Sequence, residues 1–231
     1  LSAPTSAVAE AYAALAYASL HYDFDISRAE EAVRHAIELD RHNAFAIQGR
    51  ACCLMVRGRA EEAAIESLTA MQLEPFTLVL LWNAGIFHYL ARKYDEAIEL
   101  SQKGLELDPK FAPFRWTLAF AFVQKRIYTQ AVYEAEEAVQ ISHRAPFFLG
   151  ALGHVYGAVG RTEDAFKVIT ELANLAEKRH VSARDDVCGV SRQKRRGIPL
   201  ARMCASGPRA VDGIPQSAPV VRQSALRLAV L

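Results

Sequence analysis

Alanine recurs at steps of 34 residues along most of the chain, and this period constrains the fold more than any other feature. Steps taken upstream and downstream from one alanine reach another alanine each time. The column reads Ala29, Ala63, Ala97, Ala131 and Ala165. A fixed period of this length is typical of repeat proteins, in which each unit is one supersecondary element that packs against the next.

Two further columns carry small side chains in four of their five positions. One lies seven residues after the alanine column, and the other lies twelve residues before it. The first reads Ala36, Ala70, Gly104, Ala138 and Leu172, and the second reads Tyr17, Ala51, Gly85, Ala119 and Gly153. Small side chains let two helix axes approach closely where the helices cross, because a larger group would hold the axes apart. The columns therefore indicate helix crossings.

One period, residues 78–111, shows what each unit contains. Apolar and small residues recur at helical spacing on both sides of Lys93, which lies in a connection. Asp108 and Pro109 end the second stretch, because proline cannot donate a backbone hydrogen bond. The pattern predicts two amphipathic helices joined by a short turn.

These residues resemble the tetratricopeptide repeat (TPR) family. Gly85, the stretch Tyr94-Asp95-Glu96-Ala97 and the stretch Leu107-Asp108-Pro109 match its motif. The resemblance implies an all-α fold, a right-handed α-α superhelix (TPR solenoid) of five helix-turn-helix repeats followed by a largely irregular tail. The expected division is a lead-in at 1–9, units at 10–43, 44–77, 78–111, 112–145 and 146–179, and a tail at 180–231.

The sequence departs from the family pattern in two connections. The first unit has Phe24 where the family usually carries glycine between its two helices. The proline column at the end of each unit keeps Pro75 and Pro109 but reads Arg41, His143 and Arg179 elsewhere. We expect the turn geometry of the first and fourth units to differ from that of the others.

The resemblance implies a protein or peptide partner rather than a reaction, because the first helices of TPR units line a concave groove. The family's groove-facing positions are aromatic and apolar here, which suits an apolar peptide or an amphipathic helix. They are Phe45, Gln48, Cys52, Met55, Val79, Trp82, Ile86, Tyr89, Trp116, Phe120, Val123, Phe147 and His154. The alternative is that several of these aromatic residues pack between neighbouring helices and meet no partner.

Some TPR proteins hold the terminal carboxylate of chaperone tails with Lys, Asn and Arg side chains. The matching positions here are Ala14, Ala18, Gly49, Pro113 and Thr117. These residues offer no cation for a carboxylate, so a co-chaperone function is not expected.

No residue pattern indicates catalysis, a cofactor or a metal. Gly150, Gly153, Gly157 and Gly160 have the spacing of a helix rather than of a phosphate-binding loop. The seven histidines are spread along the chain without an i, i+4 pair, and we expect His88 to be packed and hydrogen-bonded. The sequence therefore predicts a protein that is not an enzyme and needs no cofactor.

Cysteine usage and hydropathy predict a cytoplasmic protein. The four cysteines form neither a C-x-x-C pair nor a regular framework, which favours reduced thiols, and adjacent Cys52 and Cys53 are expected to be inert inside a helix. The longest apolar run starts at Leu78 and is too short to span a bilayer. No membrane anchor is expected.

The composition changes sharply near residue 180. Residues 181–231 hold nine Lys and Arg against three Asp, and all 21 aromatic residues (Phe, Tyr and Trp) lie before them. Positive charge without aromatic platforms is a poor nucleic-acid site, so no nucleic-acid binding by this segment is expected. The tail is interpreted in three ways: translation out of frame, an ordinary disordered extension, or a basic binding arm.

Several phrases also resemble TPR regions that follow effector domains in bacterial winged-helix regulators, serine/threonine kinases and adenylate-cyclase-like proteins. They lie at His21 to Asp40, Leu152 to Leu172 and Glu177 to Ser182. This resemblance implies the sensory or partner-binding part of a signalling or transcription-regulating protein. The alternative is the regulatory end of a multidomain enzyme whose catalytic domain lies upstream, since the chain begins at Leu1 without Met.

Overall fold

The computed structural model describes residues 5–187, and side chains only as far as residue 177. This part of the chain is all helical and contains no strand. The helices are α1 (Thr5–His21), α2 (Ile26–Leu39), α3 (Ala44–Val56), α4 (Ala60–Leu73), α5 (Leu78–Leu90), α6 (Tyr94–Leu107), α7 (Ala112–Gln124), α8 (Tyr128–Ile141), α9 (Pro146–Ala158) and α10 (Thr162–Val187). The interpretations of residues 188–231 as an irregular, out-of-frame or basic segment lie outside the described residues.

The helix boundaries follow the predicted period. From α3 onward each first helix of a unit begins 34 residues after the previous one, and the second helices begin at equal steps from α2 to α10. Lys93 is the N-cap of α6 and Asp108 is its C-cap, as the sequence predicted. The fold class expected from the period is therefore observed.

The first and last helices of the array extend beyond the predicted boundaries of their units. The first helix begins at Thr5 rather than at residue 10, and α10 continues to Val187, so the expected boundary at residue 179 falls inside it. The first helix is rich in alanine, the strongest helix former, and α10 contains neither glycine nor proline. Nothing in either local sequence stops the helix where the repeat length would.

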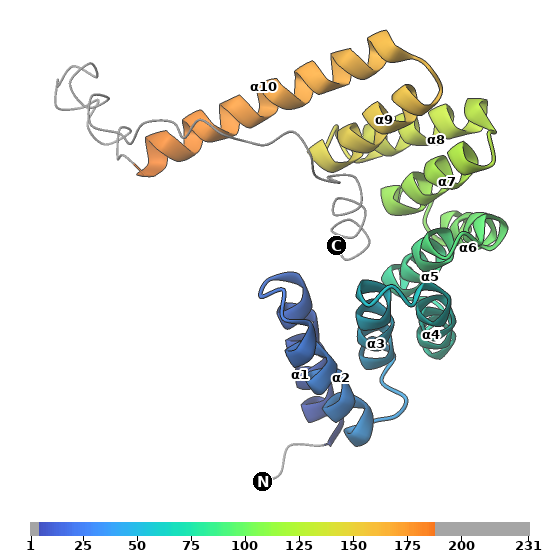
Figure 1. Ribbon diagram of the computed structural model, residues 1–231, viewed down its shortest axis with the longest axis vertical. Coiled ribbons are helices and arrows are strands. Elements are labelled where there is room, and N and C mark those ends of the chain that lie inside the picture. Colours follow the sequence, from blue (N-terminus) through green and yellow to red (C-terminus); the bar gives the residue numbers. More distant parts are fainter. Residues whose placement is uncertain (1–4, 188–231) are drawn as a thin grey trace.

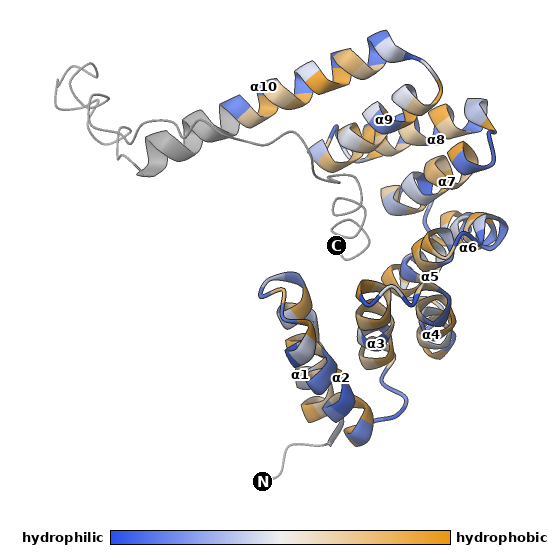
Figure 2. Ribbon diagram, in the orientation of Figure 1, coloured by the Kyte–Doolittle hydropathy of each residue, from blue (hydrophilic) through white to orange (hydrophobic). Residues whose placement is uncertain are grey.

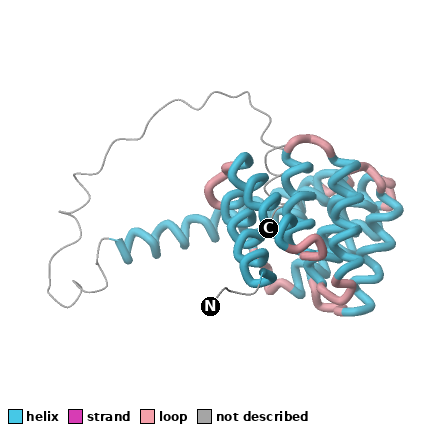
Figure 3. Tube along the Cα trace, turned by 90° about the horizontal axis from the view of Figure 1, so that it is seen from below, coloured by secondary structure: helices cyan, strands magenta, loops and turns pink. Residues whose placement is uncertain are grey.

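The helices pack as consecutive hairpins in a curved array (Figure 1). Each odd-numbered helix packs against the even-numbered helix that follows it, and also against the next odd-numbered helix. The odd-numbered helices therefore form the inner layer of the curve. Figure 3 shows the same helices from below, stacked side by side and joined by short loops.

The small-residue columns lie at the helix crossings. Ala29, Ala63, Ala97 and Ala131 are at most 1% exposed, and Ala165 is 9% exposed. Hydrophobic residues are spread along the whole array rather than gathered at one centre (Figure 2). They form two large clusters, one running from α1 to α7 and the other from α7 to α10.

The turn within each hairpin holds one residue in the left-handed backbone region. The residues at this position are Phe24, Gly58, Arg92, Arg126 and Gly160, with φ between 55° and 83°. Only glycine adopts this conformation without steric cost. Phe24 shares the positive φ of the glycines, but the first turn still differs from the others, as expected. Asp25 N–H donates to the carbonyl of Ser19, six residues back, whereas the matching bond in each other unit, such as that from Arg59 to Leu54, reaches five residues back.

The connection between α8 and α9 differs from the other connections between units. His143 and Arg144 have φ of 51° and 61°, whereas the C-caps of α2 and α6 are extended. This is the fourth unit, where proline is replaced by His143. Arg144 is held there by a bidentate pair with Glu171 of α10, through bonds of 2.8 and 2.5 Å.

In the described part of the chain, no helix is both long and apolar enough to cross a bilayer.

Candidate functional site

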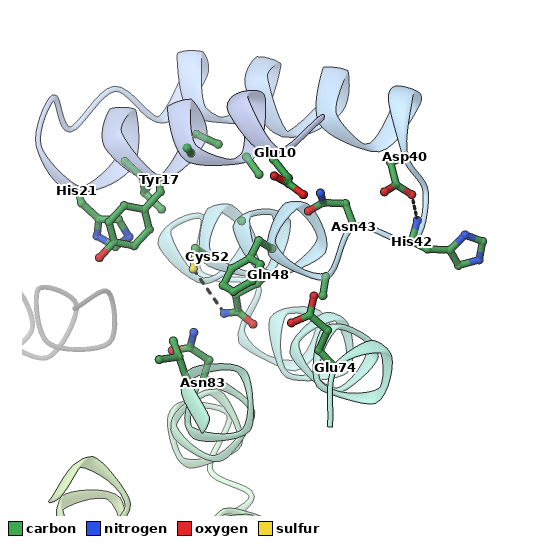
Figure 4. Close-up of a pocket in the computed structure, with 18 of the residues that line it drawn as sticks. Glu10, Tyr17, His21, Asp40, His42, Asn43, Gln48, Cys52, Glu74 and Asn83 are labelled. Carbon is green, nitrogen blue, oxygen red and sulfur yellow. Dashed lines mark hydrogen bonds between the residues drawn. The ribbon is translucent and has the colours of Figure 1, made fainter. Parts of the chain in front are cut away.

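A groove of about 730 Å³ lies at the N-terminal end of the inner layer, and we call it the N-terminal groove. Its walls are α1 and α3, the ends of α2 and α4, and the start of α5 (Figure 4). It is lined by Ser6, Glu10, Ala13, Ala14, Ala16, Tyr17, Leu20, His21, Asp40, His42, Asn43, Ala44, Phe45, Gln48, Gly49, Cys52, Glu74, Val79 and Asn83.

Helical spacing brings the lining residues onto facing surfaces. Ala13 and Tyr17 are four residues apart on α1, and Phe45, Gln48 and Cys52 follow one face of α3. The alanines of α1 have little side chain to fill the space between these helices, whereas Gly49 of α3 lies at a close contact, since a Cβ there would be 3.0 Å from Val33 Cγ2 of α2. The groove thus follows from small residues at positions where the two helices face each other.

Four of the residues expected to face a partner line this groove. Phe45 and Val79 are 51% and 45% exposed, so each offers apolar surface to solvent. Gln48 and Cys52 are buried at 5% and 8% exposure and form its floor. The groove therefore has apolar, exposed edges and a floor that is largely shielded from water.

The floor carries a polar group without a partner. Gln48 Nε2 donates to the Cys52 Sγ atom over 3.7 Å, a weak bond to sulfur. Gln48 Oε1 is buried and accepts no hydrogen bond from the described residues. A buried acceptor without a donor costs free energy, which a bound ligand with an N–H group would recover.

A second group of the expected residues lies further along the inner layer, and we call it the aromatic cluster. Its members are Trp82, Tyr89, Trp116, Phe120, Phe147 and His154 of α5, α7 and α9. Ring centroids are 5.1 Å apart between Trp116 and Phe120, and the Phe120 and His154 rings are stacked at 5.0 Å. Stacking shields one face of the imidazole from water, and this desolvation lowers the pKa of His154.

The two tryptophans of this cluster are buried between helices. Trp82 is 6% exposed and Trp116 is 4% exposed. The indole Nε1 of Trp82 donates to Thr117 Oγ1 over 3.1 Å, which links α5 to α7. Both side chains therefore pack between neighbouring first helices, as the alternative interpretation of these aromatics described, and their role in partner binding stays a prediction.

The remaining expected residues lie in the hydrophobic clusters. Met55 and Ile86 are buried in the first cluster, at 6% and 1% exposure, and Val123 is half-buried beside the second. The structure does not bring these three to the N-terminal groove.

Sequence reasoning missed Tyr17, His21 and Asn83, which line the groove. The Tyr17 and His21 rings lie 3.9 Å apart between centroids. Burial lowers the pKa of His21 to about 4, and burial is also the largest cause that raises the pKa of Tyr17. The sequence did mark Tyr17 as unusual, because it is the one large residue in a column whose other four side chains are small.

The two adjacent cysteines are buried thiols, as expected for helix positions. Burial raises the pKa of Cys52 to about 12 and that of Cys53 to about 11. Because the thiolate is the nucleophile, neither group is activated at neutral pH.

Two further interpretations from the sequence are confirmed by the structure. Gly150, Gly153 and Gly157 lie within α9, and Gly160 lies in the following turn, so they form no phosphate-binding loop. His88 is 4% exposed, and its Nδ1 atom lies 2.7 Å from the carbonyl oxygen of Ala84. Among the side chains that the structure describes, residues 5–177, no three His, Cys, Asp or Glu are grouped as a metal site would require.

Comparison with known proteins identifies the fold. No protein-family model matches the chain, and no curated protein matches it. TTC0263, a thermophilic TPR protein of Thermus thermophilus, is 15% identical with a TM-score of 0.65 over 74% of this chain and 92% of that one. PilF of Pseudomonas aeruginosa is 18% identical with a TM-score of 0.62 over 84% and 93% of the two chains.

A third similar structure covers residues 41 to the end of MamA from Desulfovibrio magneticus RS-1. It is 14% identical, with a TM-score of 0.58 over 74% of this chain and 96% of that one. At such low identity these likenesses show the fold alone. The chain folds as a TPR-like helical solenoid.

Proposed function

We propose that this chain is a protein-interaction module and that it binds a peptide or helical segment of a partner in the N-terminal groove. The observation that carries the proposal is a groove of about 730 Å³ with the exposed apolar side chains of Tyr17, Phe45 and Val79 on its lining. Large apolar side chains at the edge of a preformed groove are what helix and peptide recognition uses.

The aromatic cluster extends the proposed surface along the inner layer. Phe120, Phe147 and Tyr89 are half-buried, and His154 keeps an exposed edge. These side chains lie on the first helices of successive units, as the lining of the N-terminal groove does. A long partner segment following the inner layer would meet them after the groove.

The setting that we propose is the partner-binding part of a bacterial signalling or transcription-regulating protein in the cytoplasm. Support comes from the three phrases that resemble such proteins. The alternative setting is the regulatory end of a multidomain enzyme. Both settings assign the same role to this chain, which is binding rather than catalysis.

A display library of randomised helical peptides, selected on the full chain, tests the proposal. We expect a set of enriched peptides whose binding falls strongly in a Phe45→Ser/Val79→Ser variant, because both changes remove exposed apolar surface from the groove. The matched control is Ile65→Ser/Phe166→Ser, since Ile65 and Phe166 are 60% and 63% exposed on second helices outside the groove. Peptides that bind all three proteins equally, or no enrichment at all, would contradict the proposal.

A further inference from the structure

The N-terminal groove has an acidic end. Glu10 of α1, Asp40 after α2 and Glu74 after α4 line it there (Figure 4). Along the described lining the basic side chains are His21 and His42, with no Lys or Arg. Burial holds His21 neutral at pH 7, because its pKa is about 4. Figure 4 shows His42 at the outer edge of the groove.

The three carboxylates have no cationic partner among the described residues. Asp40 accepts from the backbone N–H of His42 over 2.9 Å, and Glu74 accepts from Thr77 Oγ1 over 2.9 Å. Some carboxylates elsewhere in the array are paired between helices, as Glu30 is with Arg57 over 2.9 Å, whereas others such as Glu61 and Glu96 are in no ion pair of the described residues. The absence of such pairs at this end leaves an uncompensated negative surface within residues 5–177.

Helix ends of both signs lie at this groove. The C-terminal ends of α2 and α4 both lie here, each is followed by an acidic C-cap, and neither helix has a basic residue in its last turn. A helix C-terminus carries about half a negative charge. The N-terminal ends of α3 and α5 also lie at the groove and carry charge of the opposite sign, so the helix ends give no net negative charge; Asn43 caps α3 by accepting from Ala46 N–H over 2.8 Å, and α5 has no side-chain cap.

The floor of the groove also favours a ligand that donates hydrogen bonds. Gln48 is 5% exposed, lines the groove, and its Oε1 atom has no donor within the described residues. A carboxylate and an amide oxygen both accept hydrogen bonds. The carboxylates and Gln48 Oε1 are acceptors, which a ligand with N–H donors and positive charge would satisfy; the other buried lining atom without a partner among the described residues is His21 Nε2.

We infer that the N-terminal groove takes a partner segment that carries Lys or Arg side chains beside an apolar face. The cationic side chains lie at the end formed by Glu10, Asp40 and Glu74, and the apolar face lies against Tyr17, Phe45 and Val79. This inference rests on the proposed function and adds the chemistry of the partner to it.

The same peptide library, compared across charge variants, tests this inference. On the native chain we expect enriched peptides to gain Lys and Arg relative to the starting library. In a Glu10→Gln/Glu74→Gln variant the enrichment of Lys and Arg should disappear. A peptide selected on the native chain should bind this variant about five- to tenfold more weakly. This loss corresponds to about 1 to 1.4 kcal/mol, which two exposed ion pairs can supply. The matched control, Glu61→Gln, removes an exposed carboxylate of α4 outside the groove and should retain the gain.

The outcomes separate this inference from the proposed function. Enriched peptides that depend on Phe45 and Val79 but show no gain in Lys and Arg would overturn the inference and leave the proposed function intact. A gain in Lys and Arg that survives in the Glu10→Gln/Glu74→Gln variant would also overturn it, because the attraction would then come from carboxylates elsewhere on the chain. No enriched peptides at all would overturn both.

Discussion

At the scale of the residue, each hairpin turn has one position with the left-handed backbone that glycine adopts without strain. Only two of the five residues at this position are glycine. Gly58 and Gly160 have φ of 81° and 83°, whereas Phe24, Arg92 and Arg126 hold side chains at positive φ. A non-glycine residue in this region costs about 1 kcal/mol or more. The turn is therefore imposed by the packing of the two helices that it joins.

Substitutions in two of these turns should have opposite effects. We expect Gly58→Ala to lower the free energy of unfolding by about 1 kcal/mol through the backbone alone, because an added Cβ would meet nothing within 4 Å. Arg92→Gly should raise it, because Arg92 already has positive φ and is exposed. Urea denaturation measures both, with Arg92→Ala as a control that should change little. A neutral Gly58→Ala variant would contradict the strain argument.

His21 should make the first hairpin sensitive to acid. Its pKa is lowered by burial from 6.5 to about 4 in the folded chain, so the unfolded chain binds a proton more readily. The stability that this difference represents is present above pH 6.5 and is lost as the pH falls toward 4. We expect the melting temperature to drop over this range, and to drop less in a His21→Gln variant. Equal pH dependence in the two proteins would exclude His21 as the cause.

At the scale of the element, small residues fix how closely the helices approach. Gly104 of α6 lies where a Cβ would overlap the ring of Phe114 in α7, and Phe114 is 0% exposed. Gly157 of α9 has no neighbour within 4 Å of an added Cβ. Two glycines inside helices of the same array therefore differ in what they do, because only one of them is at a close contact.

The difference between these two glycines predicts that replacing each of them by alanine has opposite effects on the free energy of unfolding. Gly104→Ala should destabilise the protein by about 1 to 3 kcal/mol, because the buried ring of Phe114 cannot move without displacing its neighbours. Gly157→Ala should stabilise it by roughly 0.5 to 1 kcal/mol, because alanine is the better helix former. The free energies of unfolding of the two variants, measured side by side, check this. A stabilised Gly104→Ala variant would show that the α6–α7 contact is looser than described.

At the scale of the whole molecule, the array has a protected centre and two ends with fewer neighbours. Each unit contacts only adjacent units, so the terminal helices lack packing on one side within the described array. The two large hydrophobic clusters meet at α7. We therefore expect stability to be highest near α5 to α7 and to decrease toward α1 and α10.

The positions of the tryptophans make this gradient measurable. The chain has two tryptophans, Trp82 in α5 and Trp116 in α7, and both lie at this centre. Tryptophan fluorescence should therefore report a higher urea midpoint than far-ultraviolet circular dichroism, which averages over all helices. Coincident midpoints would indicate a single cooperative transition instead of fraying ends.

The repeat register could be predicted from the sequence because it depends on local chemistry. An alanine or glycine at a crossing, a short turn and a helix stop such as Asp108-Pro109 each act over a few neighbours and recur with the period. These features determined the boundaries of α2 to α9 and the burial of Ala29, Ala63, Ala97 and Ala131. They also led to the correct conclusion that His88 and the glycines of α9 are structural.

The depth of each side chain was decided only by the tertiary structure. Helical spacing places Ile86 and His154 at the same position of their units, yet Ile86 is 1% exposed and His154 is exposed. The helix of Ile86, α5, has the first helix of the next unit, α7, packed against it, whereas α9, which carries His154, is the last first helix in the described part of the chain. Periodicity defines a direction on a helix, but burial depends on how neighbouring helices fill the space in that direction. The groove beside α1, with its acidic end, exists because distant segments converge there and leave that space open.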